Sequence, residues 1–431
     1  MKMPKITMKD DTLALLKNPY RFISSRSKDL GKDVFETRIF MQKTYCMIGR
    51  EAAELFYNPN YFIRNGASPE AMRATLFGKG GLQGLDGAEH THRKIMFMSL
   101  MTEENAGELK HLFTEKLRHY LKHWSLKEQI SLYDEFQKVL TETICAWAGI
   151  PLDDEEKVRR TKEIVSMFDS AGSKGPAHFM SRLSRKNAED WIENIVNDLR
   201  SDGYEPLIKT PIEVIIWHRD MNEELLKPHT AAVEILNLIR PVVAISVYLV
   251  FIAHALHSNP DCYEKLMMGD EEYALNFIHE VRRYYPFFPS VMARVREDFT
   301  WRDIEFKKGS RAILDLYGTN NDPRLWDSPH SFWPERFESA AVDEYNFVPQ
   351  GGGHPVKGHR CPGEFFTVEL MKTALNFFLY EMDYEVPEQN LDIEWSRLPA
   401  IPQSRFVISN VTQKTIFVRT TVSQIEISEF F

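Results

Sequence analysis

The chain has 431 residues, of which 43% are hydrophobic and 12% aromatic, so it is long enough to bury an extensive core. With 53 Lys and Arg against 62 Asp and Glu, its net charge of −9 argues against nucleic acid or an anionic membrane surface as the main partner. The four cysteines, Cys46, Cys145, Cys262 and Cys361, are far apart and form no CxxC pair, so neither a disulfide framework nor a zinc site is indicated. The charged N-terminus has no apolar signal core, and no stretch of about 20 apolar residues follows it. We therefore expect a cytoplasmic protein with no membrane anchor.

The predicted elements begin with strands and continue with helices. Alternating residues over 35–49 predict a hairpin or meander, and a helix is expected over 51–57. Apolar residues at spacings of three and four predict helices over 106–124, 128–148, 155–168, 187–201 and 231–256. The last of these is apolar on most faces, so it is expected to run buried through the centre of the fold. Strands return at 298–317 and 404–411. Because no repeat or linker interrupts the chain, we predict one domain over residues 1–431, mainly α with a smaller β portion.

The segment 347–363 constrains the chemistry of the chain more tightly than any other. Cys361 follows a glycine-rich turn at 351–353 and the basic pair His359-Arg360. Glycines let backbone N–H groups approach a sulfur, and cations favour a thiolate, which otherwise forms only near about pH 8.5. A thiolate held in this way could ligate haem iron and would promote O–O cleavage more than an imidazole does. The alternative is a glycine-rich turn that carries a buried, inert cysteine.

A second group of residues precedes this loop. Glu280 and Arg283 lie three residues apart in a predicted helix, where a carboxylate–guanidinium pair forms easily. Arg336 offers a further guanidinium that could complete a buried network. A pair at this spacing is also typical of a solvated helix face. The order along the chain is more informative, since Glu280 and Arg283 come first, Arg336 follows, and Cys361 comes last.

These three elements, in this order and spacing, resemble the cytochrome P450 superfamily over essentially the whole chain. The resemblance implies a P450 fold with haem b buried beside a long central helix, Cys361 as the axial ligand of the iron, and a structural network of Glu280, Arg283 and Arg336. It also implies basic residues at the haem propionates, for which the candidates are Arg64, His90, Lys94 and His359.

The chain departs from most P450 sequences at two places. Its cysteine loop is longer, since His354 stands where most relatives have a phenylalanine, and the nearest upstream phenylalanine is Phe347. In the central helix, typical monooxygenases have an acidic residue followed by threonine, whereas this chain has Arg240-Pro241. A proline inside a helix removes one hydrogen bond at a cost of about 3 kcal/mol, so we expect a distortion there. A guanidinium buried in the same helix requires an anion as its partner.

Arg240-Pro241 and the longer loop closely resemble the bacterial fatty-acid peroxygenases, a branch of the P450 superfamily. The resemblance implies that the carboxylate of a long-chain fatty acid pairs with Arg240 and acts as the general acid–base for hydrogen peroxide. Hydroxylation would then occur at the alpha or beta carbon, and no redox partner would be required.

Two residues near position 80 bear on the product. In this branch, decarboxylating members tend to carry histidine where this chain has Gln83, and hydroxylating members tend to carry glutamine. A neutral amide does not transfer a proton at ordinary pH, so Gln83 favours hydroxylation over the alternative, decarboxylation to terminal alkenes. Phe77 corresponds to a residue that lines the substrate pocket. The plainer interpretations are a loop amide bonded to the backbone for Gln83 and a core residue for Phe77.

Two functions of other classes also stay open. A reductase-dependent monooxygenase acting on a non-acid substrate is disfavoured by Arg240-Pro241. A haem sensor or carrier would bind haem without turning over peroxide with any acid.

Overall fold

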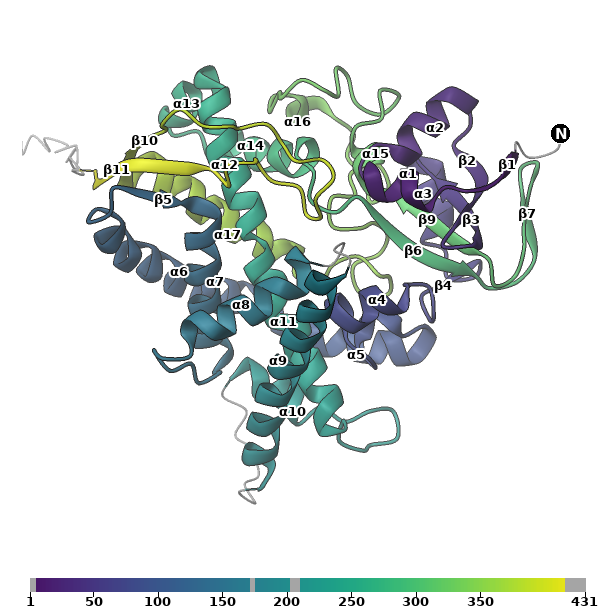
Figure 1. Cartoon of the computed structure of the whole chain (residues 1–431), viewed down its shortest axis with the longest axis horizontal. Coiled ribbons are helices and arrows are strands. Elements are labelled where there is room, and N and C mark those ends of the chain that lie inside the picture. Colours follow the sequence, from purple (N-terminus) through teal and green to yellow (C-terminus); the bar gives the residue numbers. More distant parts are fainter. Residues whose placement is uncertain (1–4, 171–174, 202–209, 415–431) are drawn as a thin grey trace, which may run out of the picture.

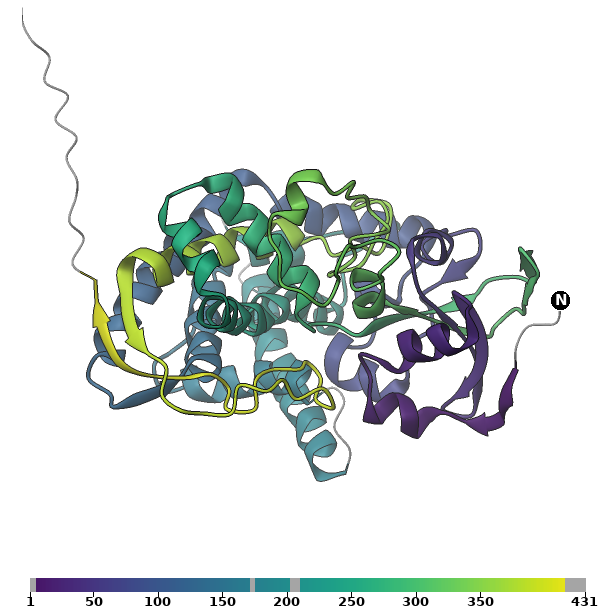
Figure 2. The same cartoon turned by 90° about the horizontal axis from the view of Figure 1, so that it is seen from above.

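The computed structural model describes residues 5–170, 175–201 and 210–414, and it consists of a large helical body with a sheet region at one end (Figure 1). Helices account for 53% of the chain and strands for 13%, which confirms the predicted class. Seen from above, the N-terminal strands and helices lie at one end of the molecule and the last strands lie at the other (Figure 2).

The main sheet has six strands in the order β1-β2-β3-β9-β6-β4. β2 and β3 form the predicted hairpin, in which Val34 pairs with Met47 and Ile39 pairs with Gln42. β4 ends directly before Arg64, whose N–H bonds to Asp86, the residue before helix α5. The strands are β1 Lys5–Asp10, β2 Val34–Ile39, β3 Gln42–Met47, β4 Phe62–Ile63, β6 Ser290–Val295 and β9 Arg311–Asp315.

Two smaller sheets complete the β portion. β7 (Phe299–Trp301) pairs with β8 (Ile304–Phe306), so the predicted strand region 298–317 divides into three strands and ends in a short helix. The other sheet has the order β10-β11-β5. Its strands are β5 Gln129–Ser131, β10 Met382–Glu385 and β11 Val407–Gln413, and β11 corresponds to the predicted strand at 404–411.

The predicted helices are present, with shifted ends. The helix predicted over 106–124 begins earlier, at Glu103, because the Thr102 side chain accepts a hydrogen bond from the N–H of Asn105 and caps it. The helix predicted over 128–148 begins only at Leu132, since the residues before it pair with β11 as strand β5. The helix predicted over 187–201 is the second half of a helix that begins at Pro176. Its first half presents Phe179, Met180 and Leu183 to solvent, which hides the usual pattern of one buried face.

The helices before the centre of the chain are α1 Thr12–Lys17, α2 Phe22–Leu30, α3 Arg50–Phe56, α4 Glu70–Met72, α5 Gly87–Leu100, α6 Glu103–Trp124, α7 Leu132–Ala148, α8 Lys157–Asp169, α9 Pro176–Ser201 and α10 Pro211–Ile216. Two short turns separate α4 from α5, a π-helical turn η1 at Arg73–Phe77 and a 3₁₀ turn η2 at Leu82–Gly84. After the centre follow α13 Pro260–Met267, α14 Glu271–Tyr284, α15 Leu316–Asn320, α16 Arg336–Ser339, α17 Glu364–Asn376 and the π-helical turn η3 Phe377–Glu381.

The long central helix is divided in two. α11 (Pro228–Ala244) and α12 (Ser246–Ser258) meet at Ile245, whose N–H bonds to the carbonyl of Val242 at 3.1 Å, three residues back rather than four. The expected distortion is therefore present, but it lies four residues after Pro241. Pro241 itself stays within α11, because its fixed φ suits a helix and only one hydrogen bond is lost.

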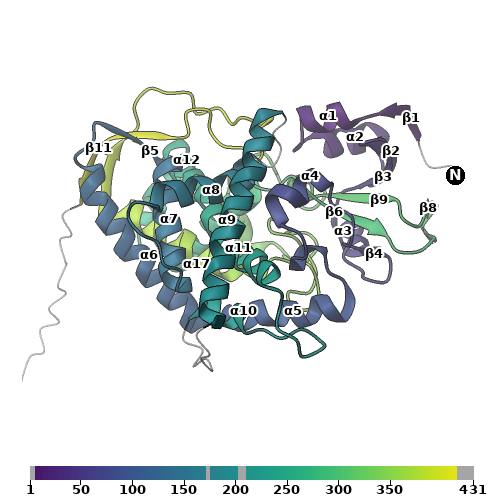
Figure 3. The ribbon, with the colours of Figure 1, turned by 60° about the horizontal axis from the view of Figure 1, so that its bottom comes forward.

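Contrary to the expectation from sequence, one helical stretch, Pro228–Ser258, is long and apolar enough to cross a membrane by length and composition. Within it, 94% of the most apolar window is buried inside the protein. α11 packs against α7, α8 and α9, and Figure 3 shows α9 lying across it. The stretch is thus the central core helix that its apolar faces predict.

Candidate active site

Cys361 lies in the loop between α16 and α17. Gly351 has a φ of 91°, and a Cβ at Gly352 would lie 2.5 Å from the carbonyl oxygen of Glu344, so the turn before the cysteine requires glycine. The N–H of Cys361 donates to the carbonyl oxygen of Gln350 at 3.2 Å, and Nε2 of Gln350 lies 3.9 Å from the sulfur. Cys361 is partly exposed, whereas the other three cysteines are buried. It is therefore the cysteine that a ligand can reach.

The cations that act on this sulfur are not those adjacent to it in sequence. Burial raises the pKa of the Cys361 thiol, and Lys94 and Arg282 oppose this rise. His359 supplies no charge at neutral pH, because burial lowers its pKa to about 3. Arg360 is paired with Glu364 at 2.6 Å. Lys94 and Arg282 therefore favour the thiolate form at this position.

The four basic residues expected at the propionates come together beside Cys361. Asp86 joins two of them, since it accepts the N–H of Arg64 at 2.8 Å and lies 3.7 Å from Nε2 of His359. The rings of His359 and His90 are 4.0 Å apart, and Nε2 of His90 is buried with no hydrogen-bond partner in the described chain. Lys94 lies one turn further along α5 and donates to the carbonyl oxygen of Gly358 at 3.3 Å, while burial lowers its pKa to about 8.

Glu280, Arg283 and Arg336 form one buried ion network. Nε and Nη2 of Arg283 donate to the two carboxylate oxygens of Glu280 at 2.7 and 2.8 Å, and Nε of Arg336 lies 3.1 Å from the same carboxylate. Glu280 and Arg283 are completely buried, and Arg336 is 4% exposed. The N–H of Trp333 also donates to Glu280 at 2.9 Å, so the network fastens α14 to the segment that leads to the cysteine loop.

Arg240 is a buried cation with no anionic partner in the part of the chain that the structure describes. Its side chain is 6% exposed, Nε has no partner in the described chain, and Nη2 lies 3.5 Å from Oδ1 of Asn237, at the limit of a hydrogen bond. Burial lowers the pKa of Arg240 to about 9, the charge of Arg185 lowers it further, and Cys361 acts in the opposite direction. Arg240 therefore lies within electrostatic reach of the sulfur and favours a negatively charged ligand.

Glu234, the acidic residue of α11, already has two partners. Its carboxylate forms an ion pair with Arg93 at 2.8 Å and accepts a hydrogen bond from Nδ2 of Asn237 at 3.0 Å. Within the part of the chain that the structure describes, Arg240 has no carboxylate within 4.0 Å. Asn237 thus links the satisfied pair Arg93–Glu234 to the unsatisfied Arg240.

Gln83 and Phe77 lie on the two turns before α5. Oε1 of Gln83 is buried and has no partner among the described residues. A Cβ placed at Gly81 would lie 3.3 Å from this oxygen and 2.7 Å from Nδ2 of Asn237, so Gly81 separates the two side chains. Gln83 is therefore close to the polar groups of α11. Phe77 ends η1, is half-buried and packs against the main hydrophobic core.

Comparison with known proteins gives a family and close structural relatives. The sequence profile described as Cytochrome P450 matches residues 252–405. A structure of cytochrome P450SP alpha (CYP152B1) in complex with (R)-ibuprophen is 46% identical, with a TM-score of 0.91, and the match covers 94% of this chain and 99% of that one. Cytochrome P450EX alpha (CYP152N1) with myristic acid is 41% identical, with a TM-score of 0.92, over 96% and 100% of the two chains. A variant of cytochrome P450 OleT in complex with arachidonic acid is 32% identical, with a TM-score of 0.92, over 97% and 100%.

The chain belongs to the cytochrome P450 family. The predicted family and its fatty-acid peroxygenase branch are confirmed, and the protein is a haem-thiolate oxidoreductase. The residues around Cys361 fit the haem that the family implies. A reachable thiol, the half-buried Arg64, the buried Lys94 and an imidazole nitrogen with no partner in the described chain provide a donor set for iron and for carboxylates.

Several residues of this P450 site were not foreseen. Glu234 and Asn237 had a signal, because with Arg240 they place a polar residue at every third position of an otherwise apolar helix. Arg185 had none, since it lies in a run of polar residues and only the fold buries it. Lys94 was expected at the propionates, but its effect on the cysteine sulfur depends on how α5 packs.

Proposed function

We propose that this P450 hydroxylates long-chain fatty acids at the alpha or beta carbon with hydrogen peroxide. The observation that carries the proposal is Arg240, whose buried guanidinium has no anion among the described residues and is close enough to Cys361 for the two charges to interact. A fatty-acid carboxylate would supply the missing charge, and this would bring its first carbons close to the haem that Cys361 would hold. The myristic and arachidonic acids bound to two relatives support this class of substrate.

Haem b, held by Cys361 with Arg64, His90, Lys94 and His359 at its propionates, would supply the oxidising chemistry from peroxide. The chain's own contribution is to place the acid. Arg240 fixes the carboxylate, and Pro241 removes one helical hydrogen bond beside it. A carboxylate oxygen held in this way accepts a proton from one oxygen of hydrogen peroxide and returns it to the other as the O–O bond breaks. Since the acid carries the proton, no acidic residue of the helix is required. Since hydrogen peroxide is already two electrons more reduced than dioxygen, no redox partner is required either.

Gln83 favours hydroxylation over decarboxylation to a terminal alkene. Its amide lies near Asn237 and can donate or accept a hydrogen bond, but it does not exchange a proton at ordinary pH. Phe77, half-buried at the end of η1, is suited to form the wall of the pocket beside the first carbons of the alkyl chain.

The test is to incubate the purified haem protein with myristic acid and hydrogen peroxide, without a reductase, and to identify the products by mass spectrometry. We expect 2- and 3-hydroxymyristic acid. A predominance of the alkene one carbon shorter would support decarboxylation instead. Absence of turnover with intact haem would contradict the proposal.

The role of Cys361 is tested separately. We expect Cys361→Ser to lose the absorption band that thiolate ligation gives to the reduced, carbon-monoxide-bound haem. Cys262→Ser, at a buried cysteine away from the loop, serves as the control and should keep it. Retention of the band in Cys361→Ser would contradict the assignment of the ligand.

A further inference from the structure

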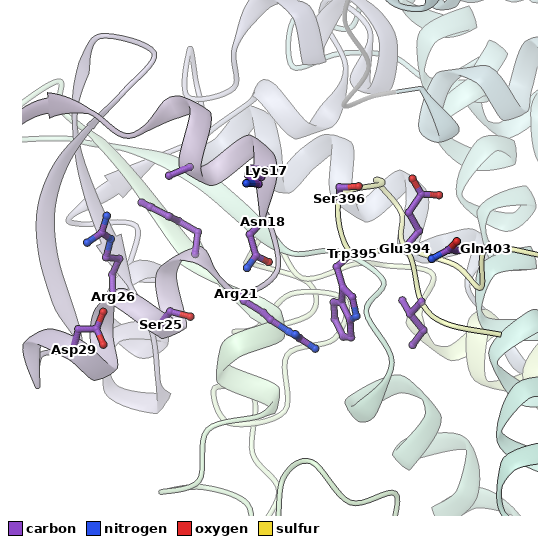
Figure 4. A pocket seen from close by; sticks show the side chains of 13 residues that line it. Lys17, Asn18, Arg21, Ser25, Arg26, Asp29, Glu394, Trp395, Ser396 and Gln403 are labelled. Carbon is purple, nitrogen blue, oxygen red and sulfur yellow. The ribbon is translucent and has the colours of Figure 1, made fainter. Parts of the chain in front are cut away.

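A pocket of about 640 Å³ lies between α1, α2 and the loop that carries Trp395 (Figure 4). Figure 4 shows Arg21 pointing toward Trp395, and the guanidinium lies 3.9 Å from the ring centroid. The charged side chains of this pocket are all exposed or half-buried, and Asp29 and Glu394 stand among its cations. The pocket therefore presents no buried charge that requires a ligand.

A second pocket, of about 530 Å³, lies between η1 and the first half of α9 and does contain such a charge. Arg185, one of its lining residues, is 2% exposed, and Nη2 of its guanidinium is buried without a hydrogen-bond partner in the described chain. Leaving a charged N–H without a partner is costly, so this nitrogen favours an anionic ligand.

The rest of the Arg185 guanidinium is fixed by the protein. Nε donates to Glu189 at 2.6 Å, and Nη1 donates to the carbonyl oxygens of Thr75 and Leu76 at 3.3 and 3.1 Å. Nη2 points toward Gly78, another lining residue, where a Cβ would lie only 2.1 Å away. The remaining donor is thus held in place before any ligand arrives, which lowers the entropic cost of binding.

The rim of the pocket matches a molecule with an anionic head and an apolar chain. Five Arg or Lys residues and one Glu line it, in a chain whose net charge is −9. Some of these cations already contact carboxylates, as Lys79 does with Glu70 at 3.4 Å, while Arg182 is exposed at the rim. Phe179 and Leu183 also line the pocket and are 68% and 43% exposed. Apolar side chains exposed beside cations suit a fatty acid better than they suit an inorganic anion.

The pocket adjoins the Arg240 site. Gly78 lines it and directly follows Phe77, and Arg185 lies close enough to Arg240 to lower the pKa of that residue. We propose that this pocket is a second carboxylate-binding site, which takes a long-chain fatty acid before it enters the Arg240 site. Arg185 and Arg182 bind the carboxylate, and Phe179 and Leu183 contact the alkyl chain. The inference rests on the proposed function for the class of ligand.

Equilibrium dialysis of the haem protein against radiolabelled myristate, kept below its micellar concentration, tests this. The wild type is expected to bind two molecules per chain, and the double variant Arg182→Gln with Lys79→Gln is expected to bind one. Lys162→Gln removes an exposed cation from α8, outside the pocket, and should leave two. A double variant that binds as many molecules as the wild type would overturn the inference.

Arg240→Gln separates this inference from the proposed function. The variant should keep one molecule, bound in the pocket, and binding of none would overturn the inference. If Arg240→Gln still binds two myristate molecules, the pocket site is supported and the pairing of Arg240 with a substrate carboxylate is contradicted. Butyrate and inorganic phosphate serve as competitors and should displace the pocket-bound myristate only weakly. Equal displacement by phosphate would show a general anion site and would overturn the assignment to fatty acids.

Discussion

Replacing Arg240 by glutamine tests the central electrostatic argument, because the residue has almost no other task in the protein. The residue is 6% exposed, and among the described residues its guanidinium has a single hydrogen-bond contact, at 3.5 Å to Asn237. Two unit charges about 4 Å apart at an effective dielectric constant of about 20 interact by about 4 kcal/mol. Since about 1.4 kcal/mol corresponds to a factor of ten, we expect the dissociation constant of myristate to rise about 10³-fold in Arg240→Gln.

The matched ligand is tetradecanol, which has the same alkyl chain and no charge. Its affinity should change less than about threefold in the same variant, because little besides the charge pair is lost. Isothermal titration calorimetry gives the binding free energy of each ligand for each protein. The loss for myristate minus the loss for tetradecanol is the energy of the pair between Arg240 and the carboxylate. The unfolding midpoint of Arg240→Gln should equal or exceed that of the wild type, since the substitution removes a buried charge without a protein anion. Equal losses for the two ligands, or a change below tenfold for myristate, would refute the reasoning.

Three further predictions concern the scaffold. Glu280→Gln should lower the free energy of unfolding by about 3–5 kcal/mol, because it leaves buried guanidinium groups without their anion; urea denaturation measures this, and a loss below about 1 kcal/mol would contradict it. Burial raises the pKa of Asp315 to about 8, far above its unfolded value of about 3.9, so the folded state binds an extra proton between these limits and loses stability as pH rises through them. Asp315→Asn should abolish this loss, which amounts to at most about 1.4 kcal/mol per pH unit, and parallel stability profiles of the two proteins over pH 5–8 would count against it. Gly78→Ala should destabilise the fold by about 1–3 kcal/mol and weaken myristate binding, since its Cβ would overlap Arg185 at 2.1 Å. Gly80→Ala, with a φ of 80° but no atom nearer than 3.8 Å, is the control for backbone strain, and equal effects of the two substitutions would exclude the overlap as the cause.

The parts of the site that could be predicted are those in which chemistry restricts the residue type. An axial thiolate requires a cysteine in a turn that only glycines can form, and an arginine beside proline inside an apolar helix has few structural explanations. These features are local in sequence, so Cys361 and Arg240 were identified without a structure. The fold then places them within electrostatic reach of each other.

The parts that could not be predicted depend on long-range packing. Arg185 is 109 residues from Leu76, whose carbonyl oxygen accepts a hydrogen bond from it, and no pattern of apolar residues in the sequence predicts that contact. The same holds for the charges around the cysteine. The neighbours of Cys361 in sequence, His359 and Arg360, are uncharged or already paired, whereas Lys94 and Arg282, which oppose the rise in its pKa, come from α5 and α14.

In the central helix, Pro241 lies beside a group of polar residues that leaves Arg240 unpaired within the described chain. Because Pro241 has no N–H, the carbonyl of Asn237 receives no helical hydrogen bond from that position. The Asn237 side chain is held by Glu234 at 3.0 Å, so it reaches Arg240 only at 3.5 Å and does not neutralise it. Arg93 occupies the rest of the Glu234 carboxylate, which keeps the one nearby acid of α11 away from Arg240. The helix thus pairs its own acid with Arg93 and leaves Arg240 without an anion among the described residues, and a bound carboxylate would supply one.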